Sequence, residues 1–173
     1  MTVAVGTRVI GARLRPGAGP ALLGVDGAAI RDAAVPVGDL WGHVGHRLTA
    51  ASPENVTTEH VVNALMARIR PGCEPDALVA AAIERLRTGE PSIAGLGQTL
   101  GVSQRQLRRR FHAAVGLSPK RMARILRLQR ALAAPLRHRD LTTTALDAGY
   151  SDHSHFVNEC RALTGLPPTT LLA

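Results

Sequence analysis

Apolar residues in the first half of the chain recur mainly at the spacing that places them on one face of a helix. Three helices are predicted: Asp39 caps the first, Thr57 or Thr58 caps the second, and Pro75 with Asp76 opens the third. The side chains expected to face inward are Trp41, Val44 and Leu48 in the first helix, Val62, Leu65, Met66 and Ile69 in the second, and Val79, Ile83 and Leu86 in the third. The stretch 39–89 is therefore predicted to be a small helical region.

The segment before this helical region has a weaker pattern. β-Branched residues interrupted by glycines predict a short β segment at the N-terminus, within residues 3–16. Its apolar positions are Val3, Val5, Val9 and Ile10. Proline and glycine then end the segment, and short helical pieces are expected at 20–23 and 28–33.

The second half of the chain contains one pattern twice, in residues 92–119 and 141–168. The positions that match at an offset of 49 residues are Leu107, Phe111, Gly116, Leu117 and Pro119, which correspond to Phe156, Cys160, Gly165, Leu166 and Pro168. Before the turn the offset is 48, because Gly101 corresponds to Gly149. The second turn is thus one residue longer, and the repeat indicates a duplicated supersecondary unit.

The first copy predicts a short helix, a glycine turn and a second helix. Gly101 follows the apolar residues of the short helix, at a position that suits a left-handed backbone, and Ser103 is expected to cap the second helix. The inward residues of that helix are Leu107, Phe111 and Val115. Its outward residues are Gln104, Arg105, Arg108 and Arg109. Arg110 is predicted to point sideways, as a surface or phosphate-binding residue would. The short helix, the turn and the second helix together form a helix-turn-helix unit.

Long side chains with several N–H donors on one helix face suit duplex DNA. The major groove admits one helix; Arg pairs with O6 and N7 of guanine through two parallel N–H bonds, and Gln pairs similarly with adenine. Arg near the start of a helix also meets phosphates, together with backbone N–H groups. The alternative is that Arg108, Arg109 and Arg110 form a solvated helix face without a partner.

The second copy predicts a similar unit with a less charged outer face. Its outward residues are His153, Ser154, Val157 and Asn158, and its inward residues are Phe156, Cys160 and Leu163. Asp152 and Glu159 flank the outer face, so we expect weaker phosphate attraction here, with Val157 placed to meet a thymine methyl group. His153 and His155 diverge on a helix, and no metal site is predicted from them.

A linker helix is predicted between the two copies, from Ser118 and Pro119 to about Ala134. Its basic residues Lys120 and Arg124 are expected to contact DNA. About 16 helical residues span roughly 24 Å. With half of each flanking unit added, the two recognition helices could lie about 34 Å apart, which is one turn of DNA.

Charge is distributed unevenly along the chain. The net charge is +8; residues 1–90 hold nine Arg and nine acidic residues, whereas residues 91–173 hold twelve Lys or Arg and four acidic residues. The basic half is expected to bind a polyanion, either double-stranded DNA or a membrane surface. DNA is favoured, because the sequence has no apolar stretch of about 18 residues that could span a membrane. Because no signal-peptide pattern is found, the protein is predicted to lie in the cytoplasm, associated with the nucleoid. Aromatic residues make up only 2%, so an aliphatic, helical core is favoured.

No pattern indicates an enzyme. The sequence has no Gly-rich phosphate loop with its Lys, and no paired carboxylates or Ser/His/Asp arrangement stands out. Cys73 and Cys160 lack the spacing of metal ligands or of a disulfide framework, and Cys160 is predicted to be a buried free thiol. No cofactor is expected.

Residues from Ile93 to Ala173 resemble the DNA-binding domain of AraC/XylS-type regulators. The matching motifs are GVSQRQLRRRF, VGLSPKRMARILRLQRAL and AGYSDHSHF followed by LTGLPP. The resemblance implies a domain of seven helices with two helix-turn-helix units. It places base-facing roles on Arg105, Arg108 and Arg109 in the first unit, and on His153, Ser154, Val157 and Asn158 in the second. Cys160 stands where this family usually has Phe, and Asn158 stands where Arg is common.

The stretch VIGARLRPGAGPALLGVDGAAIRDAAVPVGDLWG resembles, less specifically, the tail of a sensor-like domain found in one AraC-type subgroup. We therefore expect two parts: a shortened sensor-like or helical region in residues 1–90, and a DNA-binding domain in residues 91–173. Residues 1–90 are expected to serve packing or a homodimer rather than effector binding. The function predicted is a sequence-specific transcription regulator, with RNA polymerase as a further candidate partner. The alternative is an interaction module that pairs with a full-length regulator and does not itself bind DNA.

Overall fold

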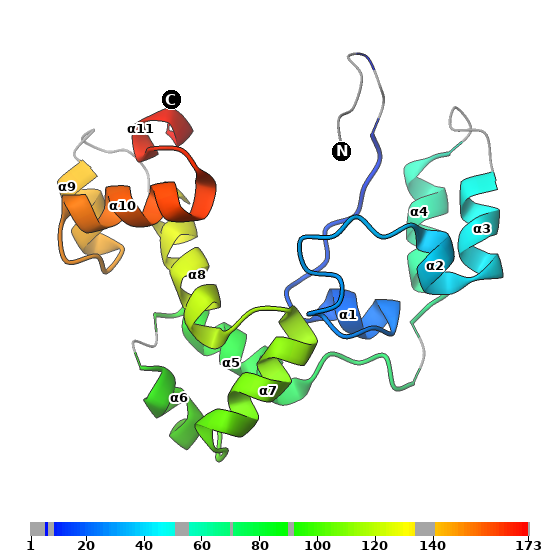
Figure 1. The fold of residues 1–173 in the computed structure, drawn as a ribbon, viewed down its shortest axis with the longest axis horizontal. Coiled ribbons are helices and arrows are strands. Elements are labelled where there is room, and N and C mark those ends of the chain that lie inside the picture. The colour runs from blue at the N-terminus through cyan, green and yellow to red at the C-terminus, as the bar shows by residue number, and fades with distance from the viewer. Residues whose placement is uncertain are drawn as a thin grey trace.

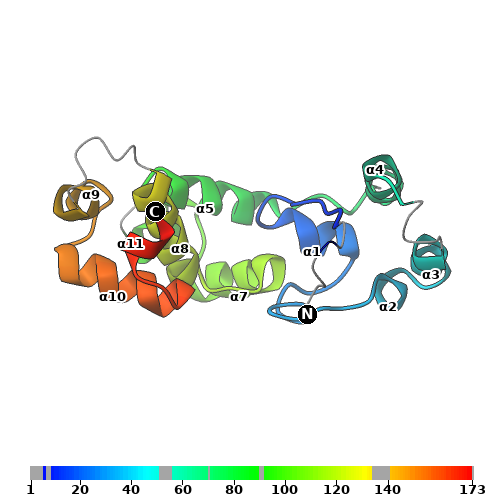
Figure 2. The ribbon, with the colours of Figure 1, turned by 90° about the horizontal axis from the view of Figure 1, so that it is seen from above.

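The computed structural model describes residues 6, 9–50, 56–69, 71–89, 92–133 and 141–172. These residues are mainly helical and contain no strand (Figure 1). In chain order the helices are α1 (Ala18–Leu23), α2 (Val37–Trp41), α3 (His43–Ala50), α4 (Thr58–Met66), α5 (Ala77–Arg87), α6 (Ile93–Thr99), α7 (Gln104–Val115), α8 (Pro119–Ala133), α9 (Leu141–Asp147), α10 (His153–Thr164) and α11 (Pro168–Leu171). Figures 1 and 2 agree that α9–α11 lie at one end of the molecule and α2–α4 at the other.

The expected N-terminal β segment is absent from the residues that the structure describes. Val9 to Pro16 form no strand, and the Val9 side chain is 68% exposed. An extended segment with no neighbouring strand leaves its backbone groups to water and remains irregular. Val3 and Val5 lie outside the described residues. The short helix expected at 20–23 is found as α1, whereas most of 28–33 consists of turns.

The helix expected to begin at Leu40 consists of two helices. α2 already begins at Val37, so Asp39 lies in its first turn and does not cap it. Gly42 has φ +55 and ends α2, and α3 begins immediately afterwards. The two helices cross so tightly that a Cβ on Gly45 would overlap the Val37 carbonyl group. This corner needs glycines, and sequence periodicity alone does not reveal it.

α4 begins at the predicted residue, but a different set of its side chains faces inward. Thr57 caps it through a capping box with His60: the His60 N–H donates to the Thr57 hydroxyl oxygen, and the Thr57 N–H donates to the His60 ring. The residues predicted to face inward are exposed by 45% (Val62), 60% (Met66) and 61% (Ile69), and of that set Leu65 is half-buried. The inward face is instead Val61, Ala64 and Leu65. Both stripes have helical spacing, so the pattern in this short helix could not decide between them.

Two hydrophobic cores organise the rest of the chain. The first comprises Val79, Ala82, Ile83, Leu86, Leu96, Leu107, Phe111, Met122 and Leu126, from α5 to α8. The second comprises Leu128, Ala131, Ala145, Ala148, Tyr150, Phe156 and Cys160, from α8 to α10. α8 contributes to both cores and joins them, which confirms the predicted linker helix (Figure 1). Cys160 is fully buried and free, as expected.

The first core includes α5, which lies before the expected domain boundary. Val79, Ile83 and Leu86 are buried in it, as their spacing predicted. The described part of residues 93–173 contains six helices, α6 to α11, and adding α5 gives the seven that the resemblance implies. The division at residues 90 and 91 stays a prediction, and the packing places α5 with the helices that follow it.

A turn from the N-terminal region docks onto the end of α7. The Gly27 N–H donates to the Ala113 carbonyl oxygen at 2.6 Å, and the Arg31 guanidinium donates to the Gly116 carbonyl oxygen at 3.4 Å. The two glycines interlock: a Cβ on Gly27 would lie 2.6 Å from the Gly116 nitrogen. Only a residue without a side chain fits there, so this contact ties the turn after α1 to the first core.

Replacing Gly27 by Ala is expected to lower the free energy of unfolding by about 1–3 kcal/mol, because the added methyl group must displace backbone atoms of Gly116. Urea unfolding followed by circular dichroism measures this loss. Gly11→Ala is the matched control, since a Cβ there meets nothing within 4 Å. Equal stability of the two variants would show that the docked turn does not contribute to the folded state.

Candidate nucleic-acid interface

Local hydrogen bonds define the turn of the first unit. Ser92 caps α6 by accepting from the Gly95 N–H at 3.1 Å. Gly101 has φ +65, the left-handed conformation that its position in the turn predicted. Ser103 then caps α7 in a capping box with Gln106, with N···O distances of 3.0 and 3.2 Å. Gln106 was not singled out in the sequence, although the S-x-x-Q pattern would have identified it.

The rotation of α7 exposes the four residues predicted to face DNA. Leu107 and Phe111 are fully buried in the first core, which fixes the helix about its axis. The side chains that this rotation leaves exposed are those of Gln104, Arg105, Arg108 and Arg109. Within the described residues no ion pair holds any of the three arginines. They form a row of free guanidinium groups on one helix face.

Arg110 has a structural role instead. Its Nε and Nη2 atoms both donate to the Asp76 carboxylate at 2.7 Å, which ties α7 to α5. Asp76 also caps α5 by accepting from the Val79 N–H at 3.1 Å. Partial burial raises the pKa of Asp76, but the Arg110 and Val79 hydrogen bonds outweigh this effect and leave the pKa below its usual value. The hydrogen bond to Asp76 in turn raises the pKa of Arg110.

The second unit is built in the same way. Asp152 caps α10 by accepting from the His155 N–H at 2.7 Å, and this bond, with a second from Ser151, lowers the pKa of Asp152. Phe156 and Cys160 are fully buried and fix the rotation of α10. The predicted contact residues His153, Ser154 and Asn158 are exposed, and Val157 is half-buried. The second face is therefore accessible but, as predicted, poor in charge.

Glu159 does not flank this face, as the sequence had suggested. Its side chain is only 7% exposed and lies between two arginines of α8. Arg124 Nε approaches Glu159 Oε2 at 2.9 Å, and Arg127 Nη2 approaches Oε1 at 3.2 Å. Arg124, which was predicted to contact DNA, thus pairs with α10, whereas Lys120 is exposed at the start of α8. No sequence pattern joins residues that lie 35 positions apart.

Arg127 extends this cluster to the start of the second unit. Its guanidinium carbon lies 4.8 Å from the centre of the Tyr150 ring, and its Nη1 donates to the Gly149 carbonyl oxygen at 3.2 Å. Burial, followed by the nearby Glu159 charge, raises the pKa of Tyr150 to about 12. The cluster joins the linker helix α8, the turn before α10 and α10 itself.

The comparisons with known proteins agree with this geometry. A family profile described as a helix-turn-helix domain matches residues 96–173. Residues 96–173 are a helix-turn-helix domain. The match runs from α6 through α11 and includes both units and the linker helix. It supports the AraC/XylS-type resemblance of this part of the chain, and domains of this kind bind DNA and regulate transcription. No curated protein and no solved structure matches the chain.

An acidic residue from the N-terminal region borders the helix-turn-helix domain. A hollow of about 430 Å³ beside α7 is lined by Asp26, Arg108, Arg109, His112, Ala113 and Ser118. Asp26 lies in the docked turn, and its carboxylate accepts from the Ala28 N–H at 2.7 Å. Ser118 caps α8 by accepting from the Arg121 N–H at 3.2 Å. Sequence reasoning did not place Asp26 next to two of the predicted DNA contacts.

The described part of the chain offers neither a helix that could cross a membrane nor a cluster of metal ligands. None of its helices combines the length and the apolar character that a membrane crossing requires. Within the same residues, no group of three His, Cys, Asp or Glu side chains is placed to hold a metal ion. His153 and His155 lie in α10, where His155 packs edge-on against Tyr150.

Proposed function

We propose that the chain is a sequence-specific transcription regulator of AraC/XylS type, which places α7 and α10 in two major-groove segments of duplex DNA. The observation that supports this most directly is the row of exposed arginines on α7, which pair with none of the described residues and which the buried Leu107 and Phe111 hold on one side of the helix. Free guanidinium groups on a rigid helix suit bidentate pairing with guanine.

In this proposal the role of each contact residue of α7 depends on its position along the helix. Gln104 and Arg105 lie in the first turn, where backbone N–H groups also favour a phosphate oxygen. Arg108 and Arg109 follow one turn later on the same side and extend the contact along the groove. All four residues therefore reach the groove together.

The second unit is proposed to bind more weakly. Ser154 and Asn158 supply hydrogen-bonding groups, His153 lies at the start of the helix, and Val157 offers an apolar contact to thymine. Lys120, at the start of α8, is proposed to contact a phosphate. Arg124 is half-exposed and its Nε faces Glu159, so we propose that it orients α10 and adds at most a phosphate contact.

Selection of bound duplexes from a random DNA pool, followed by anisotropy titrations over a range of salt concentrations, tests the proposal. We expect an enriched motif with two segments about 10 base pairs apart, and an affinity that falls steeply as salt rises, because phosphate contacts release counterions. Absence of binding at low salt would contradict the proposal. It would favour the alternative, an interaction module that pairs with another regulator, for which the exposed Val62, Met66 and Ile69 offer an apolar surface.

The proposed function also implies where the regulator acts and which proteins it meets. It would act at the nucleoid in the cytoplasm, near RNA polymerase. The same exposed apolar residues, two in α4 and Ile69 just after it, would serve a homodimer through residues 1–90. Sedimentation of the free chain over a range of concentrations measures such a dimer.

A further inference from the structure

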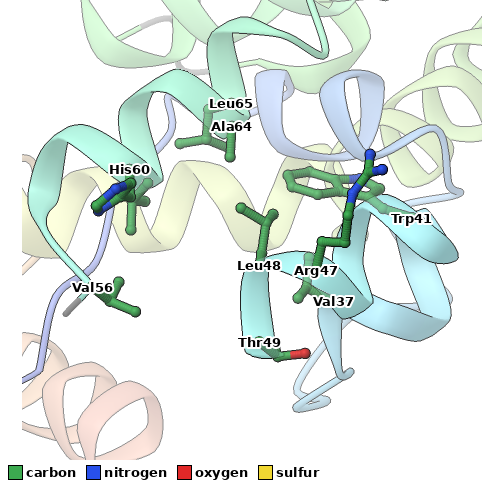
Figure 3. A pocket seen from close by; sticks show the side chains of 10 residues that line it. Val37, Trp41, Arg47, Leu48, Thr49, Val56, His60, Ala64 and Leu65 are labelled. Atoms are coloured by element: carbon green, nitrogen blue, oxygen red, sulfur yellow. The ribbon is translucent and has the colours of Figure 1, made fainter. Parts of the chain in front are cut away.

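An apolar cavity of about 370 Å³ lies between α4 and the pair of α2 and α3, far from the helix-turn-helix domain (Figures 1 and 3). The residues that line it are Val37, Trp41, Arg47, Leu48, Thr49, Val56, His60, Val61, Ala64 and Leu65. In Figure 3, Leu48 of α3 points toward Ala64 and Leu65 of α4, and Trp41 forms the wall beside them. Most of these side chains are aliphatic or aromatic, so the cavity offers dispersion contacts and few hydrogen bonds.

Interactions outside the cavity set the shape of each of its walls. On one side, Gly45 fixes the corner between α2 and α3, because a Cβ there would overlap the Val37 carbonyl group, and Gly38 lies against the His46 ring. On the other side, the capping box fixes the start of α4. The Arg68 guanidinium lies 5.3 Å from the centre of the Trp41 ring and links the end of α4 to α2. Within the described residues, the Arg68–Trp41 contact therefore joins the two walls, and the space between them is lined mainly by apolar side chains.

The size and chemistry of the cavity identify the kind of occupant. An apolar cavity of about 150 Å³ stays dry and holds one benzene molecule, so the space here suits a compact molecule of roughly 10–15 non-hydrogen atoms. The volume also lies within the usual range of ligand pockets, about 300–1,000 Å³. The polar groups among the lining residues include one permanent cation, Arg47, which stands beside Trp41 in Figure 3. A molecule with one anionic group at its end would match that arrangement.

A protein partner fits another surface of the same helix better. Val62 and Met66 point outward from α4, are 45% and 60% exposed, and do not line the cavity. A helix presents such a stripe as a convex ridge, which suits a partner helix or a second copy. The cavity on the inward face is concave and bounded by three helices, which is the shape that encloses a small molecule.

We infer that this cavity is a binding site for a compact, mostly apolar small molecule, and that Arg47 favours an occupant with one anionic group. Binding buries apolar surface of the ligand against Trp41, Leu48 and Leu65 and fills space that is otherwise without contacts. This site is separate from the proposed DNA contacts, so its test requires no DNA, and its failure would leave the proposed function untouched.

Trp41 allows the site to be tested directly, because it is the only tryptophan in the chain and forms a wall of the cavity. Adamantane-1-carboxylate is a suitable probe: it is compact, carries one anionic group and does not absorb where tryptophan does. We expect a saturable change in Trp41 emission on titration. The neutral 1-adamantanol should bind more weakly and the cationic 1-adamantylammonium more weakly still, and Arg47→Gln should remove this order. No saturable change up to millimolar probe would overturn the inference.

Two variants of α4 that gain the same side chain locate the probe. Ala64→Phe fills the cavity and is expected to weaken binding at least about tenfold, whereas Val62→Phe on the exposed face should leave it within about twofold. Circular dichroism checks that each variant is folded, and Ala64→Leu replaces Ala64→Phe if the larger side chain prevents folding. Equal binding by the inward and outward variants would place the probe elsewhere and overturn the inference.

Discussion

Replacing Arg105 or Arg109 by Ala is expected to weaken binding to the selected DNA by about 1–3 kcal/mol for each residue, which is roughly 5- to 150-fold in Kd. Each substitution removes a guanidinium group that is exposed and that pairs with none of the described residues, so no contact within the described part of the chain is lost with it. Anisotropy titrations with the selected duplex and with a scrambled duplex of equal length measure the effect.

The two duplexes separate base recognition from phosphate binding. If an arginine pairs with guanine, the variant loses affinity for the selected duplex and much less for the scrambled one. If it contacts phosphate, both affinities fall alike and the salt dependence becomes shallower. Arg87→Ala is the control, since Arg87 lies on α5 and pairs locally with Glu84. A loss for Arg87→Ala as large as for Arg105→Ala would contradict the proposed interface.

Replacing Glu159 by Ala is expected to lower the free energy of unfolding by about 2–4 kcal/mol. Removal of one partner of a buried ion pair commonly costs about 3–5 kcal/mol, because the remaining charge is left without compensation. The value here is reduced because Arg124 and Arg127 are 36% and 26% exposed and can turn toward water. Urea unfolding followed by circular dichroism measures the loss.

Glu84→Ala is the matched control for this experiment. Glu84 also pairs with an arginine, at 3.0 Å, but both side chains are more than half exposed, and the change should be below about 1 kcal/mol. Equal losses for the two variants would show that burial of Glu159 adds nothing. Glu159→Gln keeps one acceptor oxygen and loses the charge, so a smaller loss than for Glu159→Ala would show that one hydrogen bond to an arginine stabilises the fold without the electrostatic attraction.

The helix-turn-helix units could be predicted because their determinants are local. Ser103 lies one residue before α7, Gly101 forms the turn, and the spacing of Leu107 and Phe111 sets which side of α7 is buried. Once that side is known, the opposite side must carry Arg105 and the two arginines that follow it. The predicted contact residues thus lie where the pattern placed them, although their binding to DNA remains a proposal.

Periodicity was less informative where a helix is short and apolar on more than one side. In α4 the stripe containing Val62 and Met66 and the stripe containing Val61 and Ala64 both fit helical spacing. The position of α4 opposite α2 and α3 decides which stripe faces inward, and the space between these helices is the cavity. The tight crossing at Gly38 and Gly45 was likewise invisible, because a glycine in a sequence does not show which backbone will approach it.

The amino-acid sequence by itself determined the two repeated units, the linker helix and the basic face of α7, because caps, turns and helical spacing act over a few residues. Only the tertiary structure decided that Arg110 binds Asp76, that Arg124 binds Glu159 and that Gly27 docks against Gly116. These partners lie between 34 and 89 positions apart along the chain. The packing of the two cores brings the first two pairs together, and the docked turn brings the third. No local preference of either partner specifies the other.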